Sequence, residues 1–337
     1  MQVLIANQEQ VSALLPMREC IGVMENALRL LAQGKALLPL RTMMILPDGQ
    51  NLMGLMPSYL GGTSSESMGV KVIAAFPSNY GTEYDTHQGV VLLFDARRGL
   101  LQAIVDGTAV TAIRTAAVSA VATKLLARPD ADDLALIGAG TQARTHLEAM
   151  LCVRPIRRVR VFSLPLEGAY QFAERESRRH GIPIQVKESA QEAVASASLI
   201  CTVTTAKQPV VLGEWIAPGA HINAVGAFTP TTRELDTAAV VKSRLYVDRR
   251  ESALNEAGEF LIPKSEGVIG DRHIVGEIGE ILVGNAAGRT SEDEITLFKS
   301  LGIAIEDLAA AQHIFEQAQA QQVGAWVEIG GRHFGKS

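Results

Sequence analysis

The stretch "LALIGAGTQARTHLEAM", residues 134–150, joins an apolar run to a helix-forming segment through two closely spaced glycines. Gly138 permits a tight turn, Gly140 lets the backbone approach a ligand, and Ala143 lets a helix sit close to a sheet. The free N–H groups at the start of such a helix favour an anion. The pattern therefore predicts a pyrophosphate site and, with it, a dinucleotide cofactor.

The next apolar run, "RVRVF", ends just before Ser163, where the residue that reads the adenosine ribose is expected. An Asp or Glu at this position would bind both ribose hydroxyls of NAD. Ser163 does not repel a 2′-phosphate, but Leu164 and Pro165 supply no Arg to bind one. The cofactor is therefore NADP or NAD, with a slight preference for NADP.

Strand-like runs alternate with helix-like segments from residue 134 onward. The runs are "LALIG", "RVRVF", "IPIQV", "LICTVTT", "HINAV" and "RLYVD". This alternation predicts a parallel sheet that helices cover on both faces. Because a ligand lies outside the carboxyl ends of such strands, we expect Thr204, Gly226 and Phe228 near the cofactor.

The first third of the chain has a different pattern. The turn signals "PDGQ" and "ARRG" separate pairs of strand-like runs, which predicts antiparallel hairpins. Helices are expected at 17–33, 111–127 and 305–322, and the last of these rejoins the first part of the chain. The fold class is therefore α/β. We expect a Rossmann dinucleotide-binding domain, residues 116–305, inserted in a discontinuous α+β domain, residues 1–115 plus 306–337.

Composition narrows the possible partners. The chain has 337 residues, is 47% hydrophobic and carries a net charge of −5, which disfavours a nucleic-acid or membrane-surface partner. Its three cysteines are scattered, which predicts neither a disulfide framework nor a zinc site, and no histidine spacing indicates another metal. We see no signal peptide and no run of 18 apolar residues, so a cytoplasmic protein is expected. The segment "GNAAGRT", residues 284–290, lacks the Lys of a phosphate loop and is interpreted as an ordinary loop.

Three basic residues occupy unusual places. Arg41 opens a strand-like run, Lys71 lies inside the apolar run "GVKVIAAF", and Arg114 lies in a helix of small residues. A cation in such a place is rarely buried unless it is paired, although Lys71 could also lie on a solvated face. Together the three predict a pocket for a carboxylate. Arg can bind a carboxylate with two parallel hydrogen bonds, and Lys can bind it as a point charge.

The order of several motifs along the chain resembles one known family, the ornithine cyclodeaminase/mu-crystallin family. The motifs are "LMGLMPSYL", "GVKVIAAFPSN", "GVVLLFDARRG", "DGTAVTAIRTAAVSAVAT", "LIGAGTQARTHL", "NAVGAFTP", "EAGEF" and "ITLFKSLGIAIEDLAAA". The resemblance covers nearly the whole chain. It implies a homodimer whose first domain binds substrate and dimerises, a nicotinamide cofactor, and a small amino or imino acid as substrate.

The resemblance also assigns roles to individual residues. Arg41, Lys71 and Arg114 match the set that holds the substrate carboxylate, Leu301 matches a residue beside the substrate, and Lys71 is the candidate catalytic residue. The expected cofactor contacts, including the glycines of the motif, are Thr86, Arg114, Thr115, Gly138, Gly140, Thr141, Gln142, Ser163, Thr204, Val225, Gly226 and Ser300.

One departure from the family pattern bears on the reaction. Cyclodeaminases and related alanine dehydrogenases carry an Asp where this chain has Phe228, and the lysine of some members is Thr232 here. Oxidative deamination requires a general acid/base near C2 and its nitrogen, which a Phe cannot supply. Reduction of a preformed cyclic imine requires less, and a Phe there would exclude water.

Our leading hypothesis is therefore an NAD(P)H-dependent reductase of cyclic imino acids, with Phe228 beside the substrate. Its substrates would be Δ1-pyrroline-2-carboxylate or Δ1-piperideine-2-carboxylate, and its products proline or pipecolate. Two alternatives remain open. One is an ornithine cyclodeaminase or amino-acid dehydrogenase that uses another base, and the other is a mu-crystallin-like protein that binds nicotinamide and a small ligand without turnover.

Overall fold

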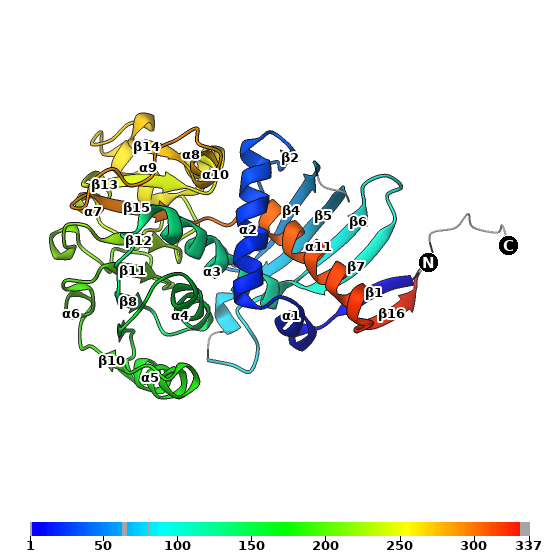
Figure 1. Ribbon diagram of the computed structural model, residues 1–337, viewed down its shortest axis with the longest axis horizontal. Helices are drawn as coiled ribbons and strands as arrows, with labels where there is room; N and C mark the ends of the chain where they lie inside the picture. The colour runs from blue at the N-terminus through cyan, green and yellow to red at the C-terminus, as the bar shows by residue number, and fades with distance from the viewer. Residues whose placement is uncertain (1, 63–65, 80, 331–337) are drawn as a thin grey trace. The chain divides into compact units, whose positions relative to one another are not determined.

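A computed structural model describes residues 2–62, 66–79 and 81–330 of the protein (Figure 1). The chain folds into two compact units: unit 1 comprises residues 1–114 with 303–337, and unit 2 comprises residues 115–302. The first division falls inside one continuous helix, α3 (Gly107–Leu126).

Unit 1 is built on a mostly antiparallel sheet in the order β16-β1-β7-β6-β5-β4-β2, with β3 paired to β4 and only β1 and β7 parallel. Its strands are β1 (Gln2–Ala6), β2 (Ala36–Leu37), β3 (Thr42–Ile45), β4 (Leu52–Leu60), β5 (Ser67–Ala75), β6 (His87–Asp95), β7 (Leu101–Asp106) and β16 (Ala325–Glu328). Its helices are α1 (Gln8–Leu14), α2 (Met17–Ala32), the 3₁₀ turn η1 (Pro77–Asn79), the start of α3, and α11 (Ala304–Gln321).

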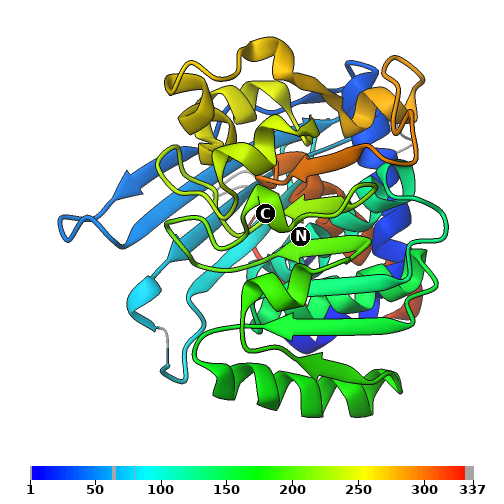
Figure 2. The same ribbon diagram turned by 90° about the vertical axis from the view of Figure 1, so that its left-hand side faces the viewer.

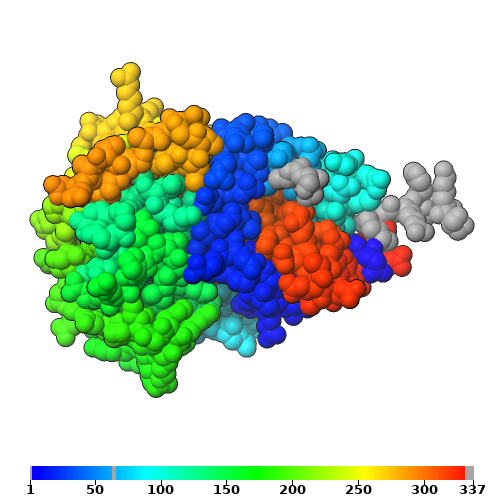
Figure 3. Space-filling view, in the orientation of Figure 1, coloured from blue at the N-terminus to red at the C-terminus, as the bar shows by residue number. Residues whose placement is uncertain are grey.

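Helix α11 covers one face of this sheet. It contacts β4, β5, β6, β7 and α2, and α2 lies beside it in Figure 3. The approach is close: a Cβ at Gly69 would lie 2.9 Å from Leu308 Cδ1, and Ser58 Oγ donates to the Ala304 carbonyl at 3.1 Å. The small residues Gly69 and Ser58 therefore allow the helix to pack closely on the sheet.

The other face of the unit 1 sheet is apolar and more exposed. Strand β4 alternates between buried residues that face α11 and the outward Met53 and Leu55, which are 42% and 41% exposed. Met44 of the neighbouring β3, which pairs with Met53 on the same face, is 55% exposed. Among the described residues of unit 1, no helix packs on this outer face. Large apolar patches of this kind typically mark an interaction surface.

Unit 2 contains a fully parallel sheet in the order β10-β9-β8-β11-β12-β15-β13-β14 (Figure 2). Its strands are β8 (Asp133–Ile137), β9 (Arg158–Phe162), β10 (Ile184–Val186), β11 (Leu199–Thr202), β12 (His221–Ala224), β13 (Ser243–Val247), β14 (Ile274–Glu277) and β15 (Ile295–Lys299). Its other helices are α4 (Thr141–Val153), α5 (Leu166–His180), α6 (Ala190–Val194), η2 (Gly213–Trp215), α7 (Thr237–Val241), α8 (Arg250–Glu256), α9 (Gly258–Ser265), η3 (Asp271–His273) and α10 (Ile278–Leu282).

The central strands of unit 2 are buried along their whole length, and most of their residues are apolar. The chain runs from β8 outward to β9 and β10, and then returns to the opposite side of β8 as β11. This reversal is the topological switch point of a Rossmann-type sheet. The α/β fold class expected from the sequence, with a Rossmann-type domain inserted in a discontinuous α+β domain, is confirmed.

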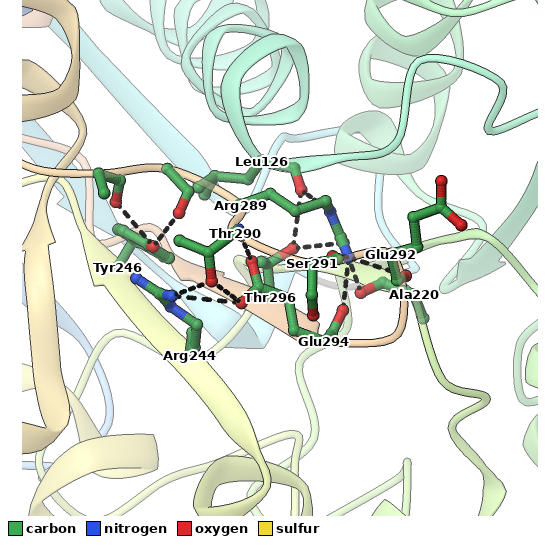
Figure 4. A network of polar contacts seen from close by, with 12 residues as sticks. Leu126, Ala220, Arg244, Tyr246, Arg289, Thr290, Ser291, Glu292, Glu294 and Thr296 are labelled. Atoms are coloured by element: carbon green, nitrogen blue, oxygen red, sulfur yellow. Dashed lines mark hydrogen bonds and ion pairs between the residues drawn. The ribbon is translucent and has the colours of Figure 1, made fainter.

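The loop 284–290 joins elements at the amino-terminal edge of this sheet. The Arg289 guanidinium donates to the carbonyl oxygens of Leu126, Ala220 and Glu294 at 2.7, 3.2 and 2.5 Å (Figure 4). Ala220 and Glu294 directly precede β12 and β15, and Leu126 ends α3. Arg289 therefore ties a helix end to two strand starts, at the edge opposite the carboxyl ends of the strands.

By length and composition alone, α3 could cross a membrane, and 78% of its most apolar window is buried inside the structure. The core helix of a soluble protein has the same properties, so this helix is weak evidence for a membrane span. Its small residues include Ala116 and Ala120, both fully buried. Ser119 and Thr123, on the same helix, bind His146 and Asn223 at 2.9 and 3.0 Å.

Candidate active site

The glycine-rich turn after β8 is shaped for a ligand. Gly138 has a φ of +118°, and a Cβ there would lie 2.8 Å from the Val203 carbonyl oxygen. Gly140 precedes α4 without a side-chain cap, and the space that its Cβ would occupy has no described atom within 4 Å. The turn thus leaves both room and unused N–H groups at the start of α4.

The carboxyl ends of β9, β11, β12 and β15 carry the other expected cofactor contacts of unit 2. Ser163 follows β9, Thr204 follows β11, Val225 and Gly226 follow β12, and Ser300 follows β15. Thr115 lies in α3, and Thr141 and Gln142 open α4. All the sheet strands are parallel, so the positions that follow these strands share one edge of unit 2.

Two polar atoms at these positions are left for a partner. Gln142 Oε1 and Ser300 Oγ are both buried and have no hydrogen-bond partner within the described part of the chain. Buried polar atoms normally are paired. These orphaned atoms, with the open space at Gly140, fit a polar ligand at this edge of the sheet.

A buried carboxylate for which the sequence predicted no role holds the loops at this edge. Glu234 is fully buried, and its two oxygens accept four hydrogen bonds, from Thr202 Oγ1, Thr204 N, Thr204 Oγ1 and Gly226 N, at 2.6 to 2.9 Å. Burial raises the pKa of Glu234, against the opposing influence of the Lys299 ammonium. These contacts join the segments that follow β11 and β12.

Lys299 and Glu259 extend this arrangement. The Lys299 ammonium lies 3.2 Å from Glu259 Oε2 and donates to the carbonyls of Ala224 and Ala227 at 3.2 and 2.5 Å. Glu259 Oε1 in turn accepts from the Glu234 backbone at 2.9 Å. A Lys at the end of the apolar strand β15, and acids in "EAGEF" and "TRELD", are the sequence signals that could have indicated a buried ion pair.

Phe228 and Leu301 lie in the loops after β12 and β15. Phe228 is partly buried and packs against the hydrophobic core of unit 2, while Leu301 belongs to that core and is 7% exposed. The Leu301 and Gly302 backbone N–H groups both donate to Asp248 Oδ2 at 2.7 Å. The loop that carries Leu301 is therefore fixed by a buried carboxylate from the end of β13.

In unit 1 the structure buries two of the three expected cations. Lys71 points to the α11 face of the sheet and is 3% exposed, so the solvated position considered from sequence is excluded. Arg114, on α3, is 4% exposed. Arg41 precedes β3 and is close enough to Lys71 to lower its pKa.

Two acids of α11 pair with these cations. Asp307 Oδ2 lies 2.8 Å from Lys71 Nζ, Asp307 Oδ1 accepts from Arg114 Nε at 2.9 Å, and Glu306 Oε2 accepts from Arg114 Nη1 at 2.7 Å. Neither acid was assigned a role from the sequence. Their signal was an acidic pair in "GIAIEDLAAA", a stretch otherwise apolar on every side of the helix.

The charges of this cluster shift its protonation equilibria. Burial lowers the pKa of Lys71 to about 8, with Asp307 opposing and Arg114 and Arg41 adding to the shift. Burial raises the pKa of Asp307, but Arg114 and Lys71 outweigh it and leave the value below that of a free carboxyl.

Thr86 and His87 lie at the start of β6, in unit 1. Thr86 Oγ1 is 3.1 Å from His87 Nδ1, and burial lowers the pKa of His87, with Lys71 contributing. His87 is therefore neutral at pH 7. No group of three or more His, Cys, Asp or Glu within the described ranges is arranged to hold a metal ion.

The model of the ornithine cyclodeaminase/mu-crystallin family matches residues 1–322. The chain belongs to this family. Among its curated members, a Δ1-pyrroline-2-carboxylate reductase of Bacillus cereus is 37% identical over 330 residues, 98% of this chain and 100% of the relative. The ketimine reductase mu-crystallin of Mus musculus is 40% identical over 283 residues, 84% of this chain and 86% of the relative.

A solved structure of the family is closely similar. It is the Δ1-pyrroline-2-carboxylate reductase of Thermococcus litoralis in complex with NADH and L-proline, with a TM-score of 0.93 and 41% sequence identity. The match covers 96% of this chain and 99% of that one. The fold and the family are thus shown over nearly the whole length of both proteins.

Proposed function

We propose that this protein is an NAD(P)H-dependent reductase of cyclic imino acids. It converts Δ1-pyrroline-2-carboxylate and Δ1-piperideine-2-carboxylate to proline and pipecolate. The observation that carries the proposal is the loop after β12, where Phe228 stands in place of a catalytic acid and the nearest acid along the chain, Glu234, is fully occupied by four hydrogen bonds. The similarity to reductases of this substrate class supports it.

Unit 2 provides most of the residues proposed to bind the cofactor. The turn at Gly138 and Gly140 and the first residues of α4 would hold the pyrophosphate, and Gln142 and Ser300 have polar atoms without partners in the described chain. When bound, a reduced nicotinamide supplies a hydride. The protein's contribution is to orient the cofactor and to exclude water from the reacting carbon.

Unit 1 provides the charged residues proposed to bind the substrate. Lys71, Arg114 and Arg41 would hold the carboxylate of the imino acid: Lys71 and Arg114 are buried beside Asp307 and Glu306, and Arg41 is close enough to Lys71 to lower its pKa. The apolar Phe228 and Leu301 suit a hydrocarbon ring rather than a charged side chain.

The alternative deaminating reactions require a base that accepts a proton before hydride leaves the substrate. Glu234 is not placed for this role, because its oxygens already accept from two strand-end loops. Lys71 would be another candidate for this base, but its contact with Asp307 favours the protonated form, which is not a base. Imine reduction is thus better supported than ornithine cyclodeamination or amino-acid dehydrogenation.

For the cofactor we propose that both NADPH and NADH are used, with NADPH preferred. Ser163 after β9 offers a hydroxyl and no negative charge toward the ribose 2′ position. This preference is tested by the ratio of kcat/KM for the two cofactors. A substitution of Ser163→Asp should shift the ratio toward NADH, and an unchanged ratio would count against this position.

We also propose a homodimer that forms through the outer face of the unit 1 sheet. The exposed residues Met44, Met53 and Leu55 support it, since they lie on one face of the sheet, on which no described helix of unit 1 packs. A cytoplasmic location is proposed too, in agreement with Cys20, Cys152 and Cys201, which form no disulfide.

A substrate panel tests the proposed function. The protein is incubated with NADPH or NADH and each of several cyclic and acyclic imino acids, and oxidation of the cofactor is followed. Rapid reduction of a five- or six-membered ring is expected. Cofactor binding without turnover of any imine would instead support the binding-protein alternative.

A further inference from the structure

Helix α11 places a pair of acids against the substrate-binding cations of unit 1. Glu306 and Asp307 occupy its first turn and are 0% and 1% exposed. Asp307 uses one oxygen for Lys71 and the other for Arg114, at 2.8 and 2.9 Å. Glu306 contacts Arg114 at 2.7 Å. Asp307 is thus the acid in direct contact with both cations.

Lys71 would lose its proton easily without such a partner. It is buried, and desolvation disfavours an ammonium ion. Around it stand Arg114 from α3, Arg41 from the segment before β3, and His87 on β6, together with the acids of α11. The two arginines repel the ammonium and the neutral His87 does not hold it, so the carboxylate of Asp307 has to stabilise the charge.

We propose that Asp307 is a positioning residue for imine reduction: it holds the Lys71 side chain in place as an ammonium ion. The inference rests on the proposed function. An ammonium has three N–H donors, so the contact with Asp307 leaves others for the substrate. The same carboxylate also accepts a hydrogen bond from Arg114, and so it fixes the position of Arg114 relative to Lys71.

In the reaction, the imine carbon takes a hydride from the reduced nicotinamide while the imine nitrogen takes a proton from Lys71 Nζ. A C–H bond and an N–H bond form, and the Lys71 N–H bond and the cofactor C–H bond break. The π electrons of the C=N bond become the pair that binds the proton. The imine is reduced, the nicotinamide is oxidised, and the neutral Lys71 regains a proton from water.

The first test measures Lys71 directly and does not depend on activity. Protein labelled with ¹³C and ¹⁵N in lysine is titrated by NMR, and the Lys71 signal is assigned by its absence in Lys71→Met. In the wild type the pKa of Lys71 is expected at about 8. In Asp307→Asn, which keeps the shape and removes the charge, it should fall by about 1 to 3 units.

The second test is the pH profile of imine reduction. Only the ammonium form supports the step, so the wild-type rate should fall as pH rises above about 8. The pH at which the rate falls should be lower by about 1 to 3 units in Asp307→Asn, and it should return to the wild-type value in Asp307→Glu. Glu306→Gln is the matched control, because Glu306 forms an ion pair with Arg114. The pH at which the rate of this variant falls should change less than in Asp307→Asn.

The outcomes separate the two proposals. A wild type that reduces no imine contradicts the proposed function, while the NMR titration still tests Asp307. An unchanged Lys71 titration in folded Asp307→Asn overturns the inference. If that variant does not fold, the wild type decides: a Lys71 that is already neutral at pH 7 overturns it, and one that is an ammonium there supports it.

Discussion

The proposed reaction depends on a single side chain, Phe228. It lies in the loop after β12, partly buried against the core of unit 2, and it brings neither a proton donor nor an acceptor. The sequence predicted that this Phe lies near the cofactor and beside the substrate. In the structure it is partly buried and packs on the core of unit 2, and its place beside the substrate remains a prediction.

Phe228→Asp is expected to change the reaction type. The new carboxylate should allow ammonia release from alanine or ornithine with an oxidised cofactor, while imine reduction falls because water gains access. Loss of apolar packing should also lower the free energy of unfolding by about 1–2 kcal/mol. Ammonia is measured with an independent colorimetric assay.

Phe228→Leu serves as the control, since it shortens the side chain without adding a base. It should keep most of the imine reductase activity and release no ammonia. Should neither variant release ammonia, position 228 by itself does not set the reaction type.

A substitution at Glu234 tests whether its buried hydrogen bonds position the loops at the carboxyl ends of the unit 2 strands, where the cofactor is proposed to bind. In Glu234→Gln an amide NH₂ replaces an oxygen that accepts from the backbone or side chains of Thr202, Thr204 and Gly226. We expect the KM for the cofactor to rise and the free energy of unfolding to fall by about 1–3 kcal/mol. The exposed Glu214→Gln is the matched control, and equal effects of the two substitutions would contradict the role of Glu234.

At the scale of elements, the alternation of strands and helices in unit 2 could be predicted well from the sequence, and the order of the strands in the sheet less well. Side-chain periodicity is a local property, so the runs that form β8, β9, β11, β12 and β13 were visible. Strand order is not local: β15 comes last in unit 2 yet lies between β12 and β13. The terminal strands β1 and β16 were also missed, since short strands take their stability from pairing.

In the candidate site, too, local features could be predicted from the sequence and contacts between distant residues could not. The cations Lys71 and Arg114 stood out because charged residues are unusual within an apolar strand or a helix of small residues. Their acidic partners did not, because Arg114 and Asp307 are 193 positions apart and meet only when α11 packs on the sheet. The roles of the cofactor contacts rest on family resemblance and remain predictions.

The amino-terminal edge of the unit 2 sheet is expected to serve stability alone. Arg289→Ala removes donors to the carbonyls of Leu126, Ala220 and Glu294, and should lower the free energy of unfolding by about 1–3 kcal/mol. The KM for the cofactor should not change, because these contacts lie opposite the carboxyl ends of the strands. Denaturant titration and cofactor kinetics measure the two effects, with the exposed Arg272→Ala as control.

At the scale of the whole molecule, the outer face of the unit 1 sheet predicts self-association. Leu55→Glu places a charge in this apolar face and should convert a dimer to a monomer in sedimentation or light-scattering measurements. Val268→Glu, at a residue of unit 2 that is 52% exposed, should leave the dimer intact. A wild type that is monomeric at micromolar concentration would rule out the proposed homodimer.

The central claim is that the protein reduces a preformed cyclic imine and does not release ammonia. One preparation decides this when it is assayed for Δ1-pyrroline-2-carboxylate reduction with NADPH or NADH and for ammonia release from ornithine and alanine with NADP⁺ or NAD⁺. We predict reduction of the imine with a kcat/KM in the ordinary enzyme range, at or above about 10⁴ M⁻¹s⁻¹, and no ammonia above background. Ammonia release as fast as imine reduction would contradict the claim.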